Sequence, residues 1–84
     1  MLYYLIVCRS LTYAQRTASS LEQKGIGAQI LRLPKSIAAE GCGYAVRVSQ
    51  KDLIDALSEL RNVGLKPKRV YVILDEGEYR EVEF

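Results

Sequence analysis

Two segments with the apolar spacing of an amphipathic helix, each followed by a glycine, constrain the fold of this chain most strongly. In residues 11–24 apolar side chains recur every third or fourth residue, and Gly25 follows at the position typical of a helix C-cap glycine. Residues 53–63 repeat this spacing and are followed by Gly64. The pattern predicts two helices, each with one apolar face that another element must cover.

Four segments rich in branched and aromatic residues surround the two helices and end at turn residues. They are residues 2–9, 28–34, 44–49 and 68–74. The order is therefore strand, helix, strand, strand, helix, strand. Two right-handed β-α-β connections that share one antiparallel sheet give the α+β ferredoxin-like split arrangement. After a turn at Glu76 and Gly77, residues 75–84 form either a short fifth strand or an acidic tail.

We expect one domain spanning residues 1–84, with both helices on the same face of the sheet. The opposite face is then open, yet Tyr3 to Ile6 and Val70 to Ile73 are apolar on both sides of their strands. This pattern favours a homodimer that buries the open face. In the alternative, the tyrosines tolerate exposure and the chain is a monomer.

The longest apolar run, residues 2–7, is far too short to cross a bilayer of roughly 30 Å. It also lacks the basic region and the cleavage site of a signal peptide. We therefore expect a soluble, cytoplasmic protein with no membrane partner.

Charge is divided unevenly along the chain. Residues 1–74 carry eleven Lys or Arg against five Asp or Glu, whereas residues 75–84 carry one Arg against five acids. A basic body is compatible with nucleic acid, an anionic ligand or an acidic protein partner. RNA recognition is not favoured, because residues 44–49 hold one aromatic residue where an RNA-recognition fold displays several.

The chain has no histidine and two cysteines, Cys8 and Cys42. The missing histidine removes the usual general base near neutral pH, and four zinc ligands at ordinary spacing are not found. Two cysteines are also too few for the disulfide framework of a small secreted domain. We expect no metal site and no cofactor, and a carrier or binding protein rather than an independent enzyme.

Cys42 stands between two glycines, Gly41 and Gly43, just before a predicted strand. Flanking glycines leave a thiol unhindered, and nearby cations favour the reactive thiolate. Arg47 lies on the strand that follows, and the sheet topology brings Arg9, Ser10 and the start of the first helix toward the same end. In the alternative, the glycines form a tight turn in which the cysteine is merely small.

Cys8 lies within a predicted strand, at the same parity as Tyr4 and Ile6, so we expect a buried, inert cysteine. Its position near the end of the first strand also allows a redox pair with Cys42.

The segments "PKSIAAEGCGYAVR" (residues 34–47) and "CRSLTYAQRTASSLEQKGI" (residues 8–26) resemble the family of small proteins described as putative selenium/sulfur carrier-like. The resemblance runs from about residue 2 to residue 74. Its most specific element is a proline, a small-residue loop, a Cys-Gly and a strand with a basic residue. These positions are Pro34, Cys42, Gly43 and Arg47, with Ser10 at the helix start.

The resemblance implies a persulfide or perselenide on Cys42, formed by one partner enzyme and handed to another, without a cofactor. Some relatives are fused to a sulfurtransferase-like domain with a Cys-Pro motif, which this sequence lacks. The resemblance also does not account for the tyrosine-rich composition or for the acidic residues 75–84.

The carrier function is thus our leading hypothesis. Two alternatives stay open. The loop around Cys42 could hold an anion or a metabolite without covalent chemistry, or Cys8 and Cys42 could form a thiol redox sensor.

Overall fold

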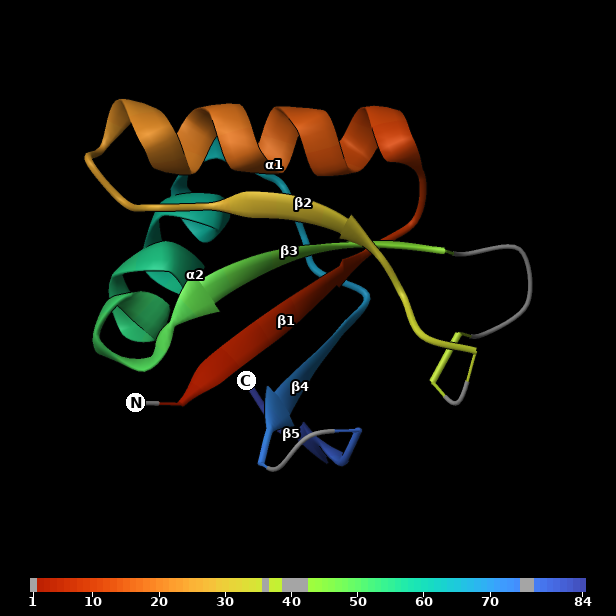
Figure 1. Ribbon diagram of the computed structural model, residues 1–84. Coiled ribbons are helices and arrows are strands. Elements are labelled where there is room, and N and C mark those ends of the chain that lie inside the picture. The colour runs from red at the N-terminus through yellow and green to blue at the C-terminus, as the bar shows by residue number, and fades with distance from the viewer. Residues whose placement is uncertain (1, 36, 39–42, 75–76) are drawn as a thin grey trace.

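The computed structural model describes residues 2–35, 37–38, 43–74 and 77–84 (Figure 1). Its elements are β1 (Tyr3–Cys8), α1 (Leu11–Gln23), β2 (Gln29–Arg32), β3 (Tyr44–Ser49), the 3-10 turn η1 (Gln50–Asp52), α2 (Leu53–Val63), β4 (Arg69–Ile73) and β5 (Tyr79–Val82). Both predicted helices and all four predicted strands are confirmed, with bounds shifted by a few residues. Of the two expectations for residues 75–84, the fifth strand is the correct one.

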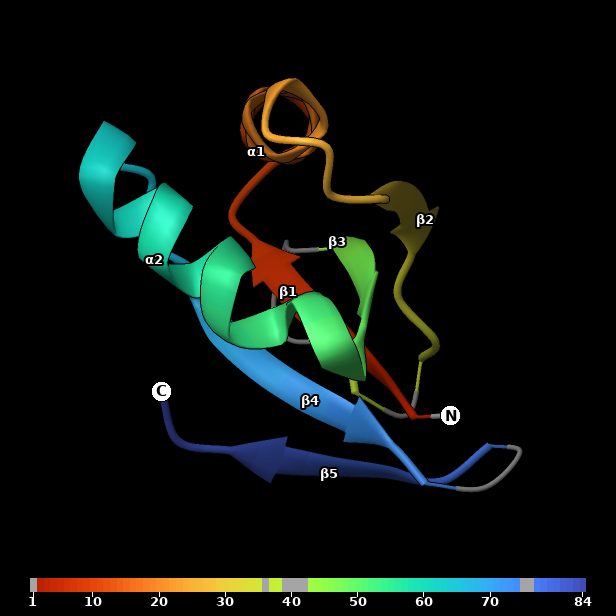
Figure 2. The ribbon, with the colours of Figure 1, turned by 90° about the vertical axis from the view of Figure 1, so that its left-hand side faces the viewer.

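The five strands form one antiparallel sheet in the order β2-β3-β1-β4-β5. Strand β3 lies between β1 and β2, and β1 lies between β3 and β4, so each helix connects two strands that are not neighbours. Both helices cover the same face of the sheet (Figure 2). The predicted α+β class is confirmed, and β5 extends the sheet beyond β4.

Both helices end in the same hydrogen-bonded turn. The N–H of Ile26 donates to the carbonyl of Leu21 at 3.0 Å, and the N–H of Leu65 donates to that of Leu60 at 2.9 Å. The intervening Gly25 and Gly64 have φ of 77° and 78°. In this turn a glycine adopts the left-handed conformation and the next residue returns to the core. Ile26 and Leu65 are indeed buried, so the glycines that marked the helix ends in the sequence also direct the chain back to the core.

The main core lies between the helices and the sheet. It contains Ile6, Cys8, Ala14, Ala18, Leu21, Ile26, Val46, Val48, Ala56, Leu60 and Leu65. Leu11, at the start of the expected stripe of α1, is 41% exposed and stays outside this core. The apolar face of α1 therefore begins at Ala14.

A second apolar cluster lies on the face of the sheet that the helices leave open. Leu5, Val7, Leu33, Ala45 and Tyr71 are buried there within a single chain. Ile37, from the connection between β2 and β3, packs against them, together with Leu31, Ile73 and Tyr79. The apolar strands thus obtain part of their cover from their own chain, which weakens the argument that led us to expect a homodimer.

No helix in the described part of the chain is long and apolar enough to span a membrane.

Replacing Leu5 tests whether the second cluster is buried by the single chain. Leu5 is 1% exposed, so Leu5→Ala should lower the free energy of unfolding by about 2 to 5 kcal/mol, because it removes buried methyl groups and leaves a cavity. Urea denaturation at several protein concentrations measures this loss. The control is Ile54→Ala, at a side chain that is 80% exposed, where the change should stay within about 0.5 kcal/mol. A loss that appears only at high protein concentration would contradict burial within one chain.

Candidate functional site

The end of β1, the end of β2 and the beginning of β3 meet at one end of the sheet. Tyr44 pairs with Cys8 of β1 on one side and with Arg32 of β2 on the other. The N–H of Leu33 donates to the carbonyl of Gly43 at 2.7 Å, which extends the β2–β3 pairing by one residue. The expectation that the end of the first strand lies beside the start of the third is therefore confirmed.

Cys42 and Gly41 lie outside the described residues. Gly43, the next residue along the chain, is half-buried and does not have a positive φ. No heavy atom of the described residues lies within 4 Å of a Cβ added at Gly43. Among these residues, neither backbone conformation nor crowding thus requires a glycine at position 43.

Ser10 caps the N-terminus of α1. Its Oγ accepts a hydrogen bond from the N–H of Tyr13 at 3.1 Å, and its backbone is extended as in an ordinary N-cap. The first turn of α1 contains no acidic residue, so no side chain there offsets the positive end of the helix dipole. In the described part of the chain, no hydrogen bond donated by the Ser10 hydroxyl is found.

Arg9 lies between the end of β1 and this cap, and its side chain is exposed. Its guanidinium lies over the ring of Tyr13, 5.0 Å from the centroid. The hydroxyl of Tyr13 in turn accepts a hydrogen bond from the N–H of Lys66 at 3.2 Å. Arg9 is thereby held beside the start of α1, as the sequence predicts, and within the described ranges no carboxylate pairs with it.

Arg47 occupies a different part of the sheet. It is half-buried on β3 and pairs with Leu5 and Gln29. Its Nη2 donates to Oε1 of Gln29 at 2.6 Å, and its guanidinium lies 4.6 Å from the centroid of the Tyr3 ring. At about 3.3 Å per strand residue, its Cα is roughly 13 Å along the strand from that of Gly43. The structure does not bring Arg47 together with Arg9 and Ser10.

Arg32 is a second cation at this end of the sheet, and the sequence analysis did not select it. Its Nη2 donates to the hydroxyl of Tyr44 at 3.0 Å, and its guanidinium lies 5.3 Å from the centre of that ring. The strand register makes Arg32 a direct neighbour of Tyr44, although twelve positions separate them. Pairing the two predicted strands, residues 28–34 and 44–49, as an antiparallel hairpin could have placed Arg32 opposite Tyr44.

Cys8 is 1% exposed and belongs to the main core, as expected from its parity. Its Sγ is 3.6 Å from the carbonyl oxygen of Ile6 and 3.8 Å from Oγ1 of Thr17, two partners that suit a weak thiol donor. This is the environment of an inert core cysteine. Within residues 2–35, 37–38, 43–74 and 77–84, no three His, Cys, Asp or Glu side chains gather as metal ligands.

The cap at Ser10 can be tested by stability. Ser10→Ala removes the acceptor for the N–H of Tyr13 and should lower the free energy of unfolding by about 1 kcal/mol. Ser10→Asp is the matched control, because a carboxylate keeps the cap and favours the positive helix end, so stability should be retained. Urea denaturation followed by circular dichroism measures both. Equal stability of the alanine and aspartate variants would show that the cap contributes nothing.

A comparison with family models gives one assignment for the chain. The family described as "Putative Se/S carrier protein-like" matches residues 3–72. These residues run from β1 into β4 and include Cys42, Gly43, Ser10 and Arg47, whereas β5 follows the matched region. Searches of curated proteins and of solved structures give no match. Because the family match covers most of the chain, this protein belongs to the putative Se/S carrier protein-like family.

Proposed function

We propose that this protein carries sulfur or selenium as a persulfide or perselenide on Cys42. The observation that carries the proposal is the family match, which spans 3–72 and includes this cysteine. The absence of histidine supports it as well, because a carrier needs a nucleophilic thiol and a docking surface but no general base of its own.

In the loading step the thiolate of Cys42 attacks the outer sulfur of a cysteine persulfide on a donor enzyme. The donor's sulfur–sulfur bond breaks as a new one forms at Cys42, and the donor cysteine leaves as a thiolate that takes up the proton released by Cys42. In the unloading step the thiolate of an acceptor cysteine attacks the same outer atom and Cys42 leaves as a thiolate. The outer atom is transferred at constant oxidation state, so the exchange needs neither oxidant nor reductant. Selenium follows the same scheme.

The end of the sheet where β3 begins offers stabilisation for this thiolate. Arg9, Arg32 and the start of α1, whose first turn has no acidic residue, contribute positive charge, and the hydroxyl of Ser10 can donate a hydrogen bond. Arg47, which we also expected to stabilise the thiolate, enters the proposal as a more distant charge held by Gln29 and Tyr3. We therefore assign the main electrostatic role to the two arginines at this end of the sheet, Arg9 and Arg32, rather than to Arg47.

Three broader expectations accompany this proposal. The ferredoxin-like arrangement is supported by the position of β3 between β1 and β2. A cytoplasmic location fits a carrier whose thiol has to stay reduced. A homodimer through the open face of the sheet is supported by Tyr3, which is 39% exposed there, and by the half-exposed Leu31 and Ile73.

A non-covalent function is the second candidate. The same gathering of Arg9, Arg32 and Ser10 beside an uncompensated helix start suits an anion or an anionic metabolite. Stabilisation of the fold by such a ligand, unchanged in Cys42→Ser, would favour this function over the carrier. The redox-sensor alternative requires the Cys8 thiol to become accessible to exchange, and Cys8 is 1% exposed.

Loading by a cysteine desulfurase with free cysteine tests the carrier proposal. Intact mass spectrometry should show the addition of one sulfur atom to the reduced protein, and peptide mapping should place it on Cys42. Cys42→Ser should lose the adduct and keep its fold by circular dichroism. Cys8→Ala is the matched control, because it removes the other thiol and should load normally. An adduct that persists in Cys42→Ser would overturn the assignment.

The charge assignment predicts a difference between two arginines. In a Cys8→Ala background, Arg9→Gln should slow alkylation of Cys42 by iodoacetamide about threefold at neutral pH and low salt, because a smaller fraction of the thiol is ionised. Arg47→Gln should have a smaller effect, and high salt should reduce both. Mass spectrometry of samples quenched at successive times measures the alkylation rates. A larger effect of Arg47→Gln would return the main role to that residue.

A further inference from the structure

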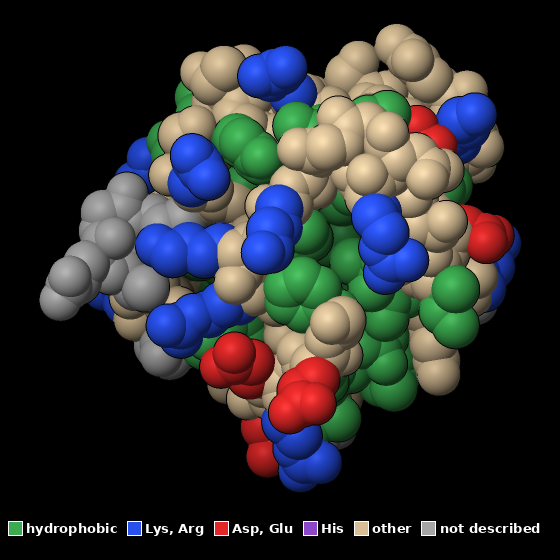
Figure 3. All heavy atoms as spheres, turned by 180° about the vertical axis from the view of Figure 1, so that it is seen from behind, with side chains coloured by type: hydrophobic (Ala, Val, Ile, Leu, Met, Phe, Trp, Pro, Cys, Tyr) green, Lys and Arg blue, Asp and Glu red, His purple; other side chains and the backbone are tan. Residues whose placement is uncertain are grey.

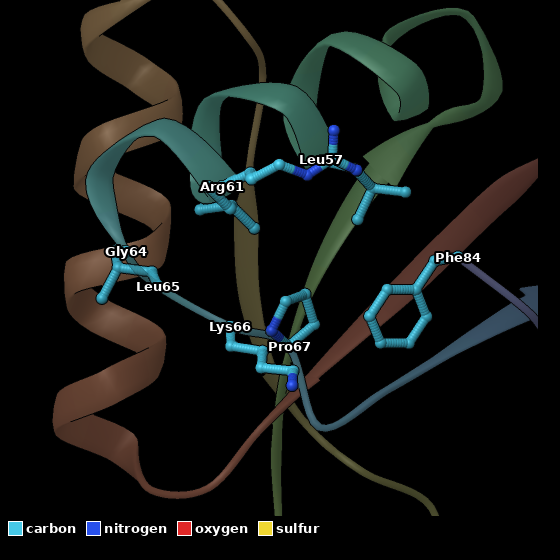
Figure 4. Close-up of a pocket in the computed structure, with 8 residues that line it drawn as sticks. Leu57, Arg61, Gly64, Leu65, Lys66, Pro67 and Phe84 are labelled. Carbon is cyan, nitrogen blue, oxygen red and sulfur yellow. The ribbon is translucent and has the colours of Figure 1, made fainter.

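A groove opens between the second half of α2, the link from α2 to β4, and the residues after β5. Its apolar walls are formed by Leu57, Leu60, Leu65, Pro67 and Phe84, and its volume is about 390 Å³. Figure 4 shows the ring of Phe84 facing Leu57 and Pro67 from the opposite side of the groove. A space of this size lies at the low end of the range for ligand pockets, and it can also accommodate apolar side chains of a peptide.

The shape of the groove follows from the way the chain leaves α2. Gly64 turns the backbone sharply, and Leu65 returns to the core. Two residues later Pro67 precedes Lys68, whose N–H donates to the carbonyl of Val7 at 2.9 Å and aligns the chain with β1. The link is thus fixed at both ends by backbone hydrogen bonds, which gives the groove a rigid wall.

Phe84 on the other wall is 56% exposed. An aromatic side chain beside an apolar recess, and not buried by its own chain, is typical of a surface that a partner covers.

The rim of the groove is cationic. Arg61 and Lys66 line it, and both are exposed. Neither forms an ion pair with any residue in the described part of the chain, in contrast to Lys24, which pairs with Glu59 at 3.9 Å. Figure 3 shows Lys and Arg side chains spread around a hollow of hydrophobic atoms, with acidic side chains below it. The rim therefore offers unpaired positive charge next to apolar surface.

The acidic residues after β4 leave these two cations without an ion pair in the part of the chain that the structure describes. Glu81 of β5 lies 3.9 Å from Arg69, and the hydrogen bond with Tyr71 together with the charge of Glu81 raises the pKa of Arg69 above its ordinary value. Further along, Glu83 precedes Phe84, and Phe84 is the residue of this segment that lines the groove. Arg61 and Lys66 therefore keep a positive charge that the carboxylates of a partner would complement.

We propose that the groove binds an acidic peptide segment of a partner protein, with one apolar side chain between Leu57 and Phe84 and carboxylates at Arg61 and Lys66. Aliphatic walls favour a peptide over nucleic acid, since bases stack on aromatic platforms and the groove has one aromatic ring. Lys66 also contacts Tyr13, over which Arg9 lies, so a partner in the groove would reach toward the end of the sheet where β3 begins. This inference goes beyond the carrier function, because binding needs no thiol.

Fluorescence anisotropy with a labelled peptide of glutamate, leucine and phenylalanine tests the proposal on the full chain carrying Cys42→Ser. We expect saturable binding that weakens as salt is raised. Lys66→Glu and Arg61→Glu should each weaken it about fivefold or more, and a peptide with serine in place of its apolar residues should bind more weakly than the parent. Because the thiol is absent, the result is independent of whether Cys42 carries sulfur.

Lys51→Glu is the matched control, because it makes the same charge change at an exposed lysine in η1, before the start of α2, a helix that is about 16 Å long. Equal losses of peptide affinity in Lys51→Glu and Lys66→Glu would show that net charge alone causes the effect, and this would overturn the proposal. No binding, or tighter binding of a single-stranded oligonucleotide than of the peptide at the same salt, would also overturn it. Circular dichroism of each variant separates lost binding from lost folding.

Discussion

The pairing of β1 on both of its edges is the interaction on which the rest of the structure depends. β1 pairs along its whole length with β3 and along most of it with β4, and its residues Leu5 to Cys8 are buried on both faces of the sheet. Because β1 is held in this way, the start of α1 follows it at a fixed place, the start of β3 lies beside its end, and Lys68 is attached to the carbonyl of Val7. The candidate site and the groove are both positioned from this one strand.

Tyrosine and arginine pairs account for much of the tyrosine-rich composition. Arg9, Arg32 and Arg47 each lie over a tyrosine ring, at 5.0, 5.3 and 4.6 Å from the centroid of Tyr13, Tyr44 and Tyr3 respectively. A planar guanidinium that rests on a ring keeps its charge at the surface while part of its conformational freedom is already lost. This small domain, without histidine and with few acids in its body, can thus present cations in defined places.

Features set by residues close together in the sequence were predictable, whereas features set by contacts between distant residues were not. The helices and their ends were predictable because apolar spacing and a C-cap glycine involve residues within one or two helical turns. The fold class followed from the order of the elements. The cover over the cluster that contains Leu5 was not predictable, since it comes from residues distant in the sequence, namely Leu31, Ile37, Ile73 and Tyr79. Arg47 seemed near Cys42 because it is five positions away, but an extended strand carries it toward Tyr3, whereas Arg32 is close to Tyr44 through strand register alone. Cys42 itself lies outside the described residues, and its role remains a proposal.

The hydrogen bond between Leu33 and Gly43 has a consequence for how this protein can vary. It joins the two ends of the connection between β2 and β3, so the sheet is complete on either side of residues 34–42. When the ends of a connection are fixed, doubling its length costs only about 0.6 kcal/mol of closure entropy. Lengthening this connection therefore costs the fold little closure entropy. The connection that contains the cysteine can grow during evolution, or be lengthened by design, while Leu33 and Gly43 still join its two ends.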